Sequence, residues 1–270
     1  MKTAAPSFAY IAQSMGDGSN HFIGISHDGM VYTWGTSNAM GQLGRTTTTT
    51  KHRLVPTMIT TCGNHIIVDP KAVYVGGSRE SGHSVILTKQ HDLYVTGCDR
   101  WQQLGLGSAS GGTAGYTWEG GRIWRNQFVV NHFIANVMEK TSGNKHVRHV
   151  ALGDDHTVIL SENQRDVYTF GKGGEGQLGV SGKPFVSAPV RSTRLSSSAN
   201  DIAAVCAIHH CSVTLDVNGE ILSKAGKCRM VQEAMVNAFK ACKDRATKDG
   251  LIGDASVHIG QAYTENDLIR

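Results

Sequence analysis

Four histidines recur along the chain in the same setting, and a recurring imidazole could act as a general base or a metal ligand. Each opens a short apolar run, and a second run ends at glycine; they are His21, His83, His156 and His210. They lie 62, 73 and 54 residues apart, and the closing glycines lie 62, 74 and 55 apart. A catalytic base is needed once, whereas a structural residue is needed in every repeat. We therefore expect buried histidines that are hydrogen-bonded between neighbouring strands.

The second group of residues that could do chemistry is Cys206, His209, His210 and Cys211, which could ligate a metal ion. Alternate residues of a strand point to opposite faces, so these four side chains do not converge on one ion. His210 is also assigned to the fourth copy of the histidine pattern. We expect no metal site here.

Residues 171–176 read GKGGEG and satisfy the dinucleotide-binding pattern G-x-G-x-x-G. That pattern requires a following helix within a βαβ unit. The aligned stretches at 35–41 and 97–102 indicate a loop that recurs in the repeats. With no Ser/His/Asp or paired-carboxylate arrangement elsewhere, we expect no catalytic residue and no cofactor.

The elements that position these residues form a repeated unit. Its clearest copy, residues 21–44, reads HFIGISHDGMVYTWGTSNAMGQLG, and further copies begin at 83, 156 and 210. It predicts a strand, a tight Asp28-Gly29 turn, a second strand and a glycine-rich loop. Another β-like run precedes each later copy, and a fourth strand is expected near 53–58 and 187–191. Four short antiparallel strands in roughly 50–60 residues predict a β-propeller blade.

The patterns G-x-x-H-[ST]-x-x-L, G-x-[VL]-Y-x-[WF]-G and G-Q-L-G resemble the repeat of the regulator of chromosome condensation (RCC1) family, over roughly residues 8–228. The resemblance implies an all-β propeller, usually a closed ring of seven blades. Seven blades would need about 350 residues, whereas four copies are recognised here. The fourth copy lacks the Trp-Gly and Gln-Leu-Gly signatures. The ring is expected to be incomplete, closed by divergent segments, or completed by another chain.

Residues 1–228 are assigned to the propeller, with an insertion at about 108–144. The insertion interleaves aromatic residues with arginines, namely Tyr116, Trp118, Arg122, Trp124 and Arg125. This composition is typical of protein-binding hot spots and, less often, of single-strand stacking platforms. We predict that these five residues contact a protein partner. The alternatives are a blade loop whose tryptophans pack onto the propeller, and a nucleic-acid contact.

Residues 229–270 are assigned to a helical C-terminal extension. Apolar residues recur there at i, i+3, i+4, i+7, i+8 and i+11, which predicts an amphipathic helix; they are Val231, Ala234, Met235, Ala238, Phe239 and Cys242. The stripe is expected to dock on the propeller itself or on another subunit.

Composition narrows the class of protein. The 32 glycines with only five prolines predict many tight turns, and the net charge of +4 is modest for a nucleic-acid binder. The sequence contains no run of 18 apolar residues, so it predicts no membrane-spanning helix. Six irregularly spaced cysteines without a secretory signal favour buried thiols in an intracellular, reducing compartment. The sequence does not distinguish cytoplasm, nucleus and organelle.

The function that these observations favour is a non-catalytic protein-interaction scaffold, a subunit of a larger assembly. The family resemblance implies an alternative, a guanine-nucleotide exchange factor for a small GTPase. Such a factor remodels the partner's nucleotide site and needs no catalytic constellation of its own. Chromatin binding is disfavoured, because the first 20 residues carry a single lysine and form no basic tail.

Overall fold

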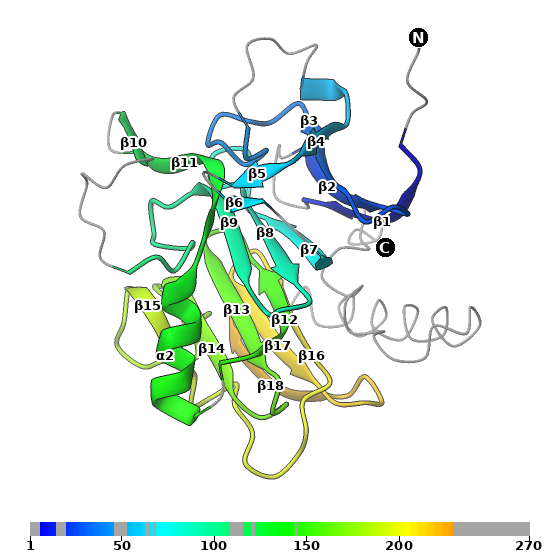
Figure 1. The fold of residues 1–270 in the computed structure, drawn as a ribbon. Helices are drawn as coiled ribbons and strands as arrows, with labels where there is room; N and C mark the ends of the chain where they lie inside the picture. The colour runs from blue at the N-terminus through cyan, green and yellow to red at the C-terminus, as the bar shows by residue number, and fades with distance from the viewer. Residues whose placement is uncertain are drawn as a thin grey trace, which may run out of the picture.

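The computed structural model describes residues 6–14, 20–45, 53–62, 65–66, 69–107, 116–119, 122–143 and 145–228. These residues form four antiparallel sheets arranged as the blades of a β-propeller (Figure 1). The innermost strands of successive blades contact one another along the arc. The predicted all-β propeller of RCC1 type is confirmed, whereas the predicted C-terminal helix lies outside the described residues.

The blades follow chain order. Blade 1 contains β1 (Phe8–Gln13), β2 (His21–Ser26), β3 (Val31–Gly35) and β4 (Thr57–Ile59). Blade 2 contains β7 (Pro70–Gly76), β8 (His83–Thr88), β9 (Leu93–Cys98), β11 (Arg122–Val130) and β10 (Tyr116–Glu119). Blade 3 contains β12 (Val147–Leu152), β13 (His156–Ser161), β14 (Val167–Lys172) and β15 (Phe185–Arg191). Blade 4 contains β16 (Ala204–Ile208), β17 (Cys211–Leu215) and β18 (Ile221–Gly226), and β5 (Thr61–Cys62) pairs with β6 (His65–Ile66) separately.

The hairpins form as the repeat predicts. In blade 1 the register pairs His21 with Gly35, and the turn between β2 and β3 places Gly29 at φ 80°. Glycine adopts this left-handed conformation without the Cβ penalty of other residues. The fourth strands β4 and β15 lie close to the expected positions.

Blade 2 differs from the expected layout, because part of the 108–144 stretch belongs to the blade. Strand β11 pairs with β9 and supplies the fourth strand, and β10 extends the sheet by one more. The helix α2 (His132–Ser142) then follows, which the sequence reading missed. The Asn131 side chain accepts hydrogen bonds from the N–H groups of Phe133 and Ile134, and Gly143 ends the helix in the left-handed conformation.

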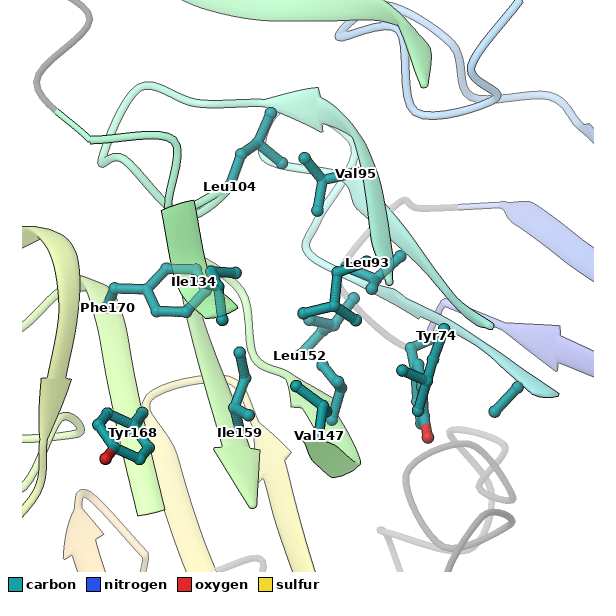
Figure 2. Close-up of a cluster of buried hydrophobic side chains, with 14 of the residues drawn as sticks. Tyr74, Leu93, Val95, Leu104, Ile134, Val147, Leu152, Ile159, Tyr168 and Phe170 are labelled. Carbon is teal, nitrogen blue, oxygen red and sulfur yellow. The ribbon is translucent and has the colours of Figure 1, made fainter. Parts of the chain in front are cut away.

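The core lies between the blades, so blades 2 and 3 pack both faces of their sheets against neighbouring blades. The largest cluster joins blades 2 and 3, and α2 contributes Ile134 and Met138 to it (Figure 2). A second cluster joins blades 1 and 2 through residues such as Ile23 and Val73, and a third joins blades 3 and 4 through Leu160 and Val205. A blade therefore depends on its neighbours to cover its apolar faces.

Candidate interaction surfaces and the joints between blades

Three equivalent polar joints connect the four blades. In each, a hydroxyl near the start of a blade's second strand donates a buried hydrogen bond to the glutamine carbonyl of the preceding Gln-Leu-Gly loop. The three pairs are Ser84 with Gln42, Thr157 with Gln103, and Ser212 with Gln177, all at 2.8 Å. The glutamine side chains meanwhile accept from the backbone of their own loops. The Gln-Leu-Gly signature thus makes an inter-blade contact.

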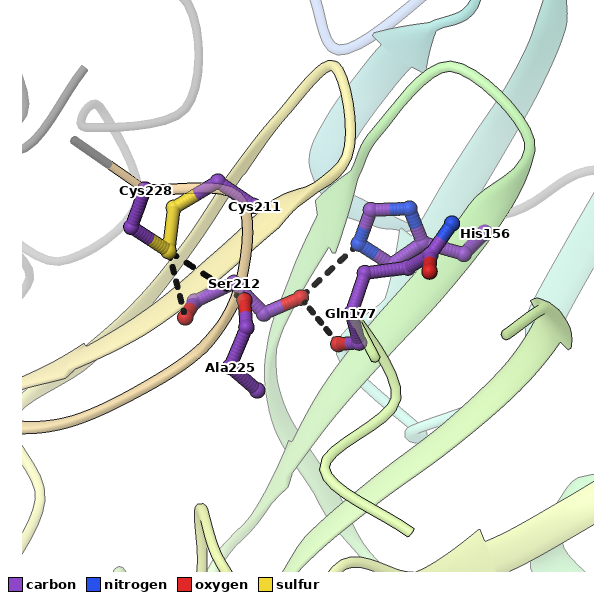
Figure 3. The surroundings of a disulfide bond; sticks show 6 residues. All are labelled: His156, Gln177, Cys211, Ser212, Ala225 and Cys228. Atoms are coloured by element: carbon purple, nitrogen blue, oxygen red, sulfur yellow. Dashed lines mark hydrogen bonds between the residues drawn. A yellow bond between two sulfur atoms is a disulfide. The ribbon is translucent and has the colours of Figure 1, made fainter. Parts of the chain in front are cut away.

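The repeat histidines complete these joints. His156 Nε2 lies 2.8 Å from Ser212 Oγ (Figure 3). Because that hydroxyl donates its proton to Gln177, we infer that His156 Nε2 is the donor in this contact. His83 Nε2 lies 3.4 Å from Thr157 Oγ1 in the preceding joint. The imidazoles bridge neighbouring blades, as the recurrence predicted.

Burial keeps these imidazoles neutral. Desolvation lowers the pKa of His156 to about 3 and that of His83 to about 4. Burial also lowers the pKa of His21 to about 3, against a smaller upward contribution from its hydrogen bond to the backbone of His83. Groups held neutral in a closed joint stabilise the fold and do not act as general bases.

The fourth histidine was assigned wrongly. The register pairs Cys211 with Gly226, as it pairs His156 with Gly171, so Cys211 occupies the histidine position in blade 4. His210 stands one residue earlier, before the strand begins. The spacings of 54 for the histidine and 55 for the glycine already contained this difference of one residue.

Cys211 forms a disulfide with Cys228, with their Cα atoms 4.9 Å apart (Figure 3). The expectation of buried thiols is therefore wrong for this pair. It describes Cys98 and Cys206 correctly, since both are buried thiols outside any disulfide, and burial raises the pKa of the Cys98 thiol to about 12. The spacing of the cysteines did not reveal the disulfide, because Cys211 and Cys228 come together only when the β17–β18 hairpin forms.

Removing the Ser212 hydroxyl tests the joint. Ser212→Ala is expected to lower the free energy of unfolding by about 1–3 kcal/mol, because His156 Nε2 and the Gln177 carbonyl lose their partner in a buried site. The matched control is Ser223→Ala, because Ser223 Oγ donates to an exposed carbonyl, that of Arg194. Urea unfolding measures both. Equal losses in the two variants would contradict a special contribution of the joint.

A polar cluster lies beside the joint between blades 3 and 4. Asp154 Oδ2 lies 3.1 Å from His209 Nδ1, and Lys172 Nζ lies 3.6 Å from Asp155 Oδ2 and 5.3 Å from the centre of the Trp101 ring. Burial would raise the pKa of Asp154, but the hydrogen bond and charge of His209 lower it overall. Burial raises the pKa of Asp155, with Lys172 opposing it. Both carboxylates thus have a basic partner, and the Asp154–His209 pair connects blades 3 and 4.

The described part of the chain contains no group of three or more histidine, cysteine or acidic side chains that could hold a metal ion. Cys211 is in the disulfide, so it does not act as a ligand of the kind considered for the 206–211 cluster. None of the helices in the described ranges is long and apolar enough to cross a membrane.

The five predicted partner-binding residues lie on the β10–β11 ribbon. The register places Tyr116 opposite Arg125, and Arg122 opposite Glu119. Trp124 is half-buried, whereas Arg125 is only 7% exposed, and its carbonyl accepts a hydrogen bond of 3.0 Å from Thr96. The structure therefore brings the five onto one ribbon and separates Arg125, which lies in the scaffold. The side chains of Tyr116, Trp118 and Arg122 lie outside the described part of the structure.

A surface that the sequence reading missed is the sheet face of blade 1 that points away from blade 2. We call this the outer face of blade 1; it consists of Phe8, Ile11, Phe22, Tyr32, Trp34 and Met58. The rings contact one another: Phe22 stacks on Trp34 with centroids 5.4 Å apart, and Phe8 meets Tyr32 edge-on. Ile11 is 47% exposed and Met58 42% exposed.

Register shows what this face corresponds to in the other blades. The row Ile11, Tyr32 and Met58 occupies the positions that Val73, Tyr94 and Val130 occupy in blade 2. The blade 2 residues pack against blade 1, whereas the blade 1 row belongs to none of the core clusters of the described residues. The outer face of blade 1 is thus built like a covered face. The signal in the sequence was the lack of polar alternation in β2 and β3, because apolar residues on both faces of a strand are typical of a strand covered on both sides.

Comparison with known proteins agrees with this architecture. Sequence profiles of the regulator of chromosome condensation (RCC1) repeat match residues 28–84 and 147–177. The protein RCC2 homolog of Danio rerio is 32% identical over 172 residues, which cover 60% of this chain and 31% of that protein. The regulator of chromosome condensation of Xenopus laevis is 25% identical over 206 residues, covering 76% and 45%. The chain thus spans less than half the length of these relatives.

Solved structures share the fold at low identity. Human WBSCR16 superposes with a TM-score of 0.60 at 17% identity, covering 96% of this chain and 55% of that one. Prp20p of Saccharomyces cerevisiae gives 0.57 at 20% identity, covering 82% and 45%. The profile matches, the blade register and these neighbours agree: the chain carries repeats of the regulator of chromosome condensation (RCC1) family, folded as blades of a β-propeller.

Proposed function

We propose that the protein is a non-catalytic interaction module that works as a subunit of a larger assembly. The observation that carries this proposal is the outer face of blade 1, where four aromatic rings and two exposed aliphatic side chains form one apolar sheet surface. Contiguous apolar surface on a soluble protein marks a site of interaction. Fully burying an exposed large apolar side chain contributes roughly 1.5–3 kcal/mol, and these half-buried rings would gain a part of that each when a partner covers them.

The chemistry of the partner follows from the equivalent faces of the other blades. At the matching positions, blades 2 and 3 receive apolar side chains from the preceding blade, such as Ile23 against Val73 and Leu87 against Ile159. The partner surface is therefore apolar and sheet-like. Phe22 stands where blades 2 to 4 carry a serine or threonine, so the joint at this face has no hydroxyl donor.

The β10–β11 ribbon is proposed as a second contact with the partner. Tyr116, Trp118, Arg122 and Trp124 supply the aromatic and guanidinium groups that dominate protein interfaces. Arg125, which is buried beside blade 1, is proposed to hold the base of the ribbon against the blade. This arrangement makes the ribbon an extension of a fixed sheet.

Charge placed on the outer face tests the main contact. The tagged double variant Ile11→Arg and Met58→Arg, expressed at native level, is expected to co-purify at least tenfold less partner than the unmodified protein. The reason is that both positions are exposed and apolar, so the substitutions place charge in the contact. The control is Val217→Arg, at a position 59% exposed in blade 4. Circular dichroism checks that all proteins are folded. Unchanged capture by the folded double variant would overturn the proposal.

The ribbon is tested separately by Trp118→Ala, Arg122→Ala and Trp124→Ala in one chain. We expect weaker capture of the same partner with little change in thermal stability. If binding stays at the level of the unmodified protein, the ribbon is not a contact.

The alternative function is nucleotide exchange on a small GTPase. The observation that favours it is the fold shared with Prp20p, whose structure was described with its binding properties to Gsp1p and histones. Exchange activity would appear as preferential capture of a nucleotide-free GTPase and as faster nucleotide release in vitro. A stoichiometric complex without any GTPase would instead support the scaffold.

A further inference from the structure

Blade 3 carries a surface hollow of about 480 Å³ that none of the contacts above uses. It lies between the glycine-rich loop that follows β14 and the turn that follows β15. Its polar side chains are Ser181, Lys183, Thr193 and Arg194, and its floor includes several glycines. This is the loop whose GKGGEG stretch matches a nucleotide-binding pattern without the helix that such a pattern needs.

The charged side chains that line the hollow are all positive. Lys183 and Arg194 are both exposed, and none of the lining residues is acidic. The nearest acidic residue of the loop, Glu175, lies outside the lining and pairs with Lys227 at 2.7 Å. Two cations that share one depression repel each other, and an anion placed between them would relieve that repulsion. Arginine and lysine beside hydroxyl donors are the groups that recognise phosphate oxygens.

The glycines keep the hollow open. A Cβ built on Gly174 or on Gly182 would meet no atom within 4 Å. The N–H groups of Gly173, Gly176 and Gly179 are already used within the loop. The side-chain donors for a ligand are those of Ser181, Lys183, Thr193 and Arg194, and the small lining residues let a tetrahedral anion approach them. The exposed Phe185 beside Pro184 offers apolar surface for whatever carries the anion.

We infer that this hollow binds a phosphate group. Lys183 and Arg194 supply the charge, and Ser181 and Thr193 donate hydrogen bonds to its oxygens. The hollow is larger than a single phosphate, so a phosphorylated side chain of a protein fits the shape as well as the free ion does. The site is independent of the outer face of blade 1, so either proposal can fail without the other.

Titration with inorganic phosphate, followed by ³¹P NMR and by thermal shift at constant ionic strength, tests the site. We expect a saturable response that weakens at least tenfold in the double variant Lys183→Gln and Arg194→Gln. Lys89→Gln removes an exposed lysine at the end of β8 in blade 2 and is expected to leave the response unchanged. Both substitutions lie at exposed positions, so the variants are expected to fold, and circular dichroism verifies this.

A second arm titrates a phosphoserine peptide and its unphosphorylated form. Binding of the phosphorylated peptide at least tenfold tighter than inorganic phosphate assigns the ligand to a phosphorylated chain, and equal affinity assigns it to the free ion. An unchanged phosphate response in the folded double variant would overturn the inference. So would an equal response to chloride at the same ionic strength.

Discussion

Gly41→Ala is expected to lower the free energy of unfolding by about 3 kcal/mol. Gly41 has φ 71°, and a Cβ there would overlap the carbonyl oxygen of Arg125 and lie 2.6 Å from Asn126 Cα. The loop of blade 1 and strand β11 of blade 2 meet at this point, backbone against backbone. The left-handed conformation costs about 1–2 kcal/mol for alanine, and the overlap adds about 1–3 kcal/mol.

The chain contains a matched control for this change. Gly29 has φ 80°, but a Cβ there meets nothing within 4 Å. Gly29→Ala therefore reports the conformational term alone, with an expected loss of about 1 kcal/mol. Chemical unfolding of both variants separates the two terms. Equal losses would show that blades 1 and 2 do not meet as closely as the structure indicates.

Acidification is expected to destabilise the protein through the joint histidines. His21, His83 and His156 have pKa values lowered to about 3, 4 and 3, whereas the unfolded chain binds protons near 6.5. Their contribution is complete above pH 6.5 and is lost as the pH falls towards 4, because only the unfolded state takes up protons in that window. Each imidazole then contributes a slope of about 1.4 kcal/mol per pH unit.

At pH 5 the three groups together remove roughly 6 kcal/mol, which is comparable with the whole stability of many domains. Thermal unfolding monitored by circular dichroism between pH 7.5 and 5 measures the slope. His83→Gln should reduce that slope by about one third, and adding His156→Gln should reduce it by about two thirds. A slope that stays the same in both variants would show that other groups govern the acid response.

The repeat made the strands predictable because the blades share one packing arrangement and similar residues. Glycine at each closing turn, an apolar run on each side and a histidine at the start of the second strand in blades 1 to 3 are local signals. The structural role of His21, His83 and His156 was also predictable, since recurrence separates a scaffold residue from a catalytic one. Those inferences needed no knowledge of the neighbouring blade.

The remaining features depend on contacts between distant residues. Whether blade 4 begins at His210 or at Cys211 depends on strand register, and a slip of one residue reverses every face of a strand. The bond between Cys211 and Cys228 depends on the hairpin closing. Strand β11 was hidden because its partner β9 precedes a Gly/Ser-rich stretch that interrupts the repeat pattern. Neither spacing nor composition identifies the strand that pairs with β9 or the cysteines that form the disulfide, and the one-residue difference in spacing at blade 4 becomes interpretable only with the register.

The candidate interaction surfaces were also predictable from the sequence only in part. The aromatic and arginine pattern identified residues 116–125 as a candidate contact, but composition did not show that Arg125 is enclosed within the blade. The outer face of blade 1 did not stand out in the sequence, because Tyr32 has tyrosine equivalents in blades 2 and 3 and Trp34 has an aromatic equivalent, Phe170, in blade 3. The equivalent residues of blade 2 pack against blade 1, whereas the outer face of blade 1 packs against no other described blade. This difference is visible only in the three-dimensional structure.

The three polar joints all run in one direction. In each of them the carbonyl acceptor belongs to the earlier blade and the hydroxyl donor to the later one. During synthesis the acceptor loop therefore leaves the ribosome before its donor, so each hydroxyl–carbonyl bond forms only after the later blade has been made. The order of the blades along the chain thus sets the order in which these inter-blade bonds can close.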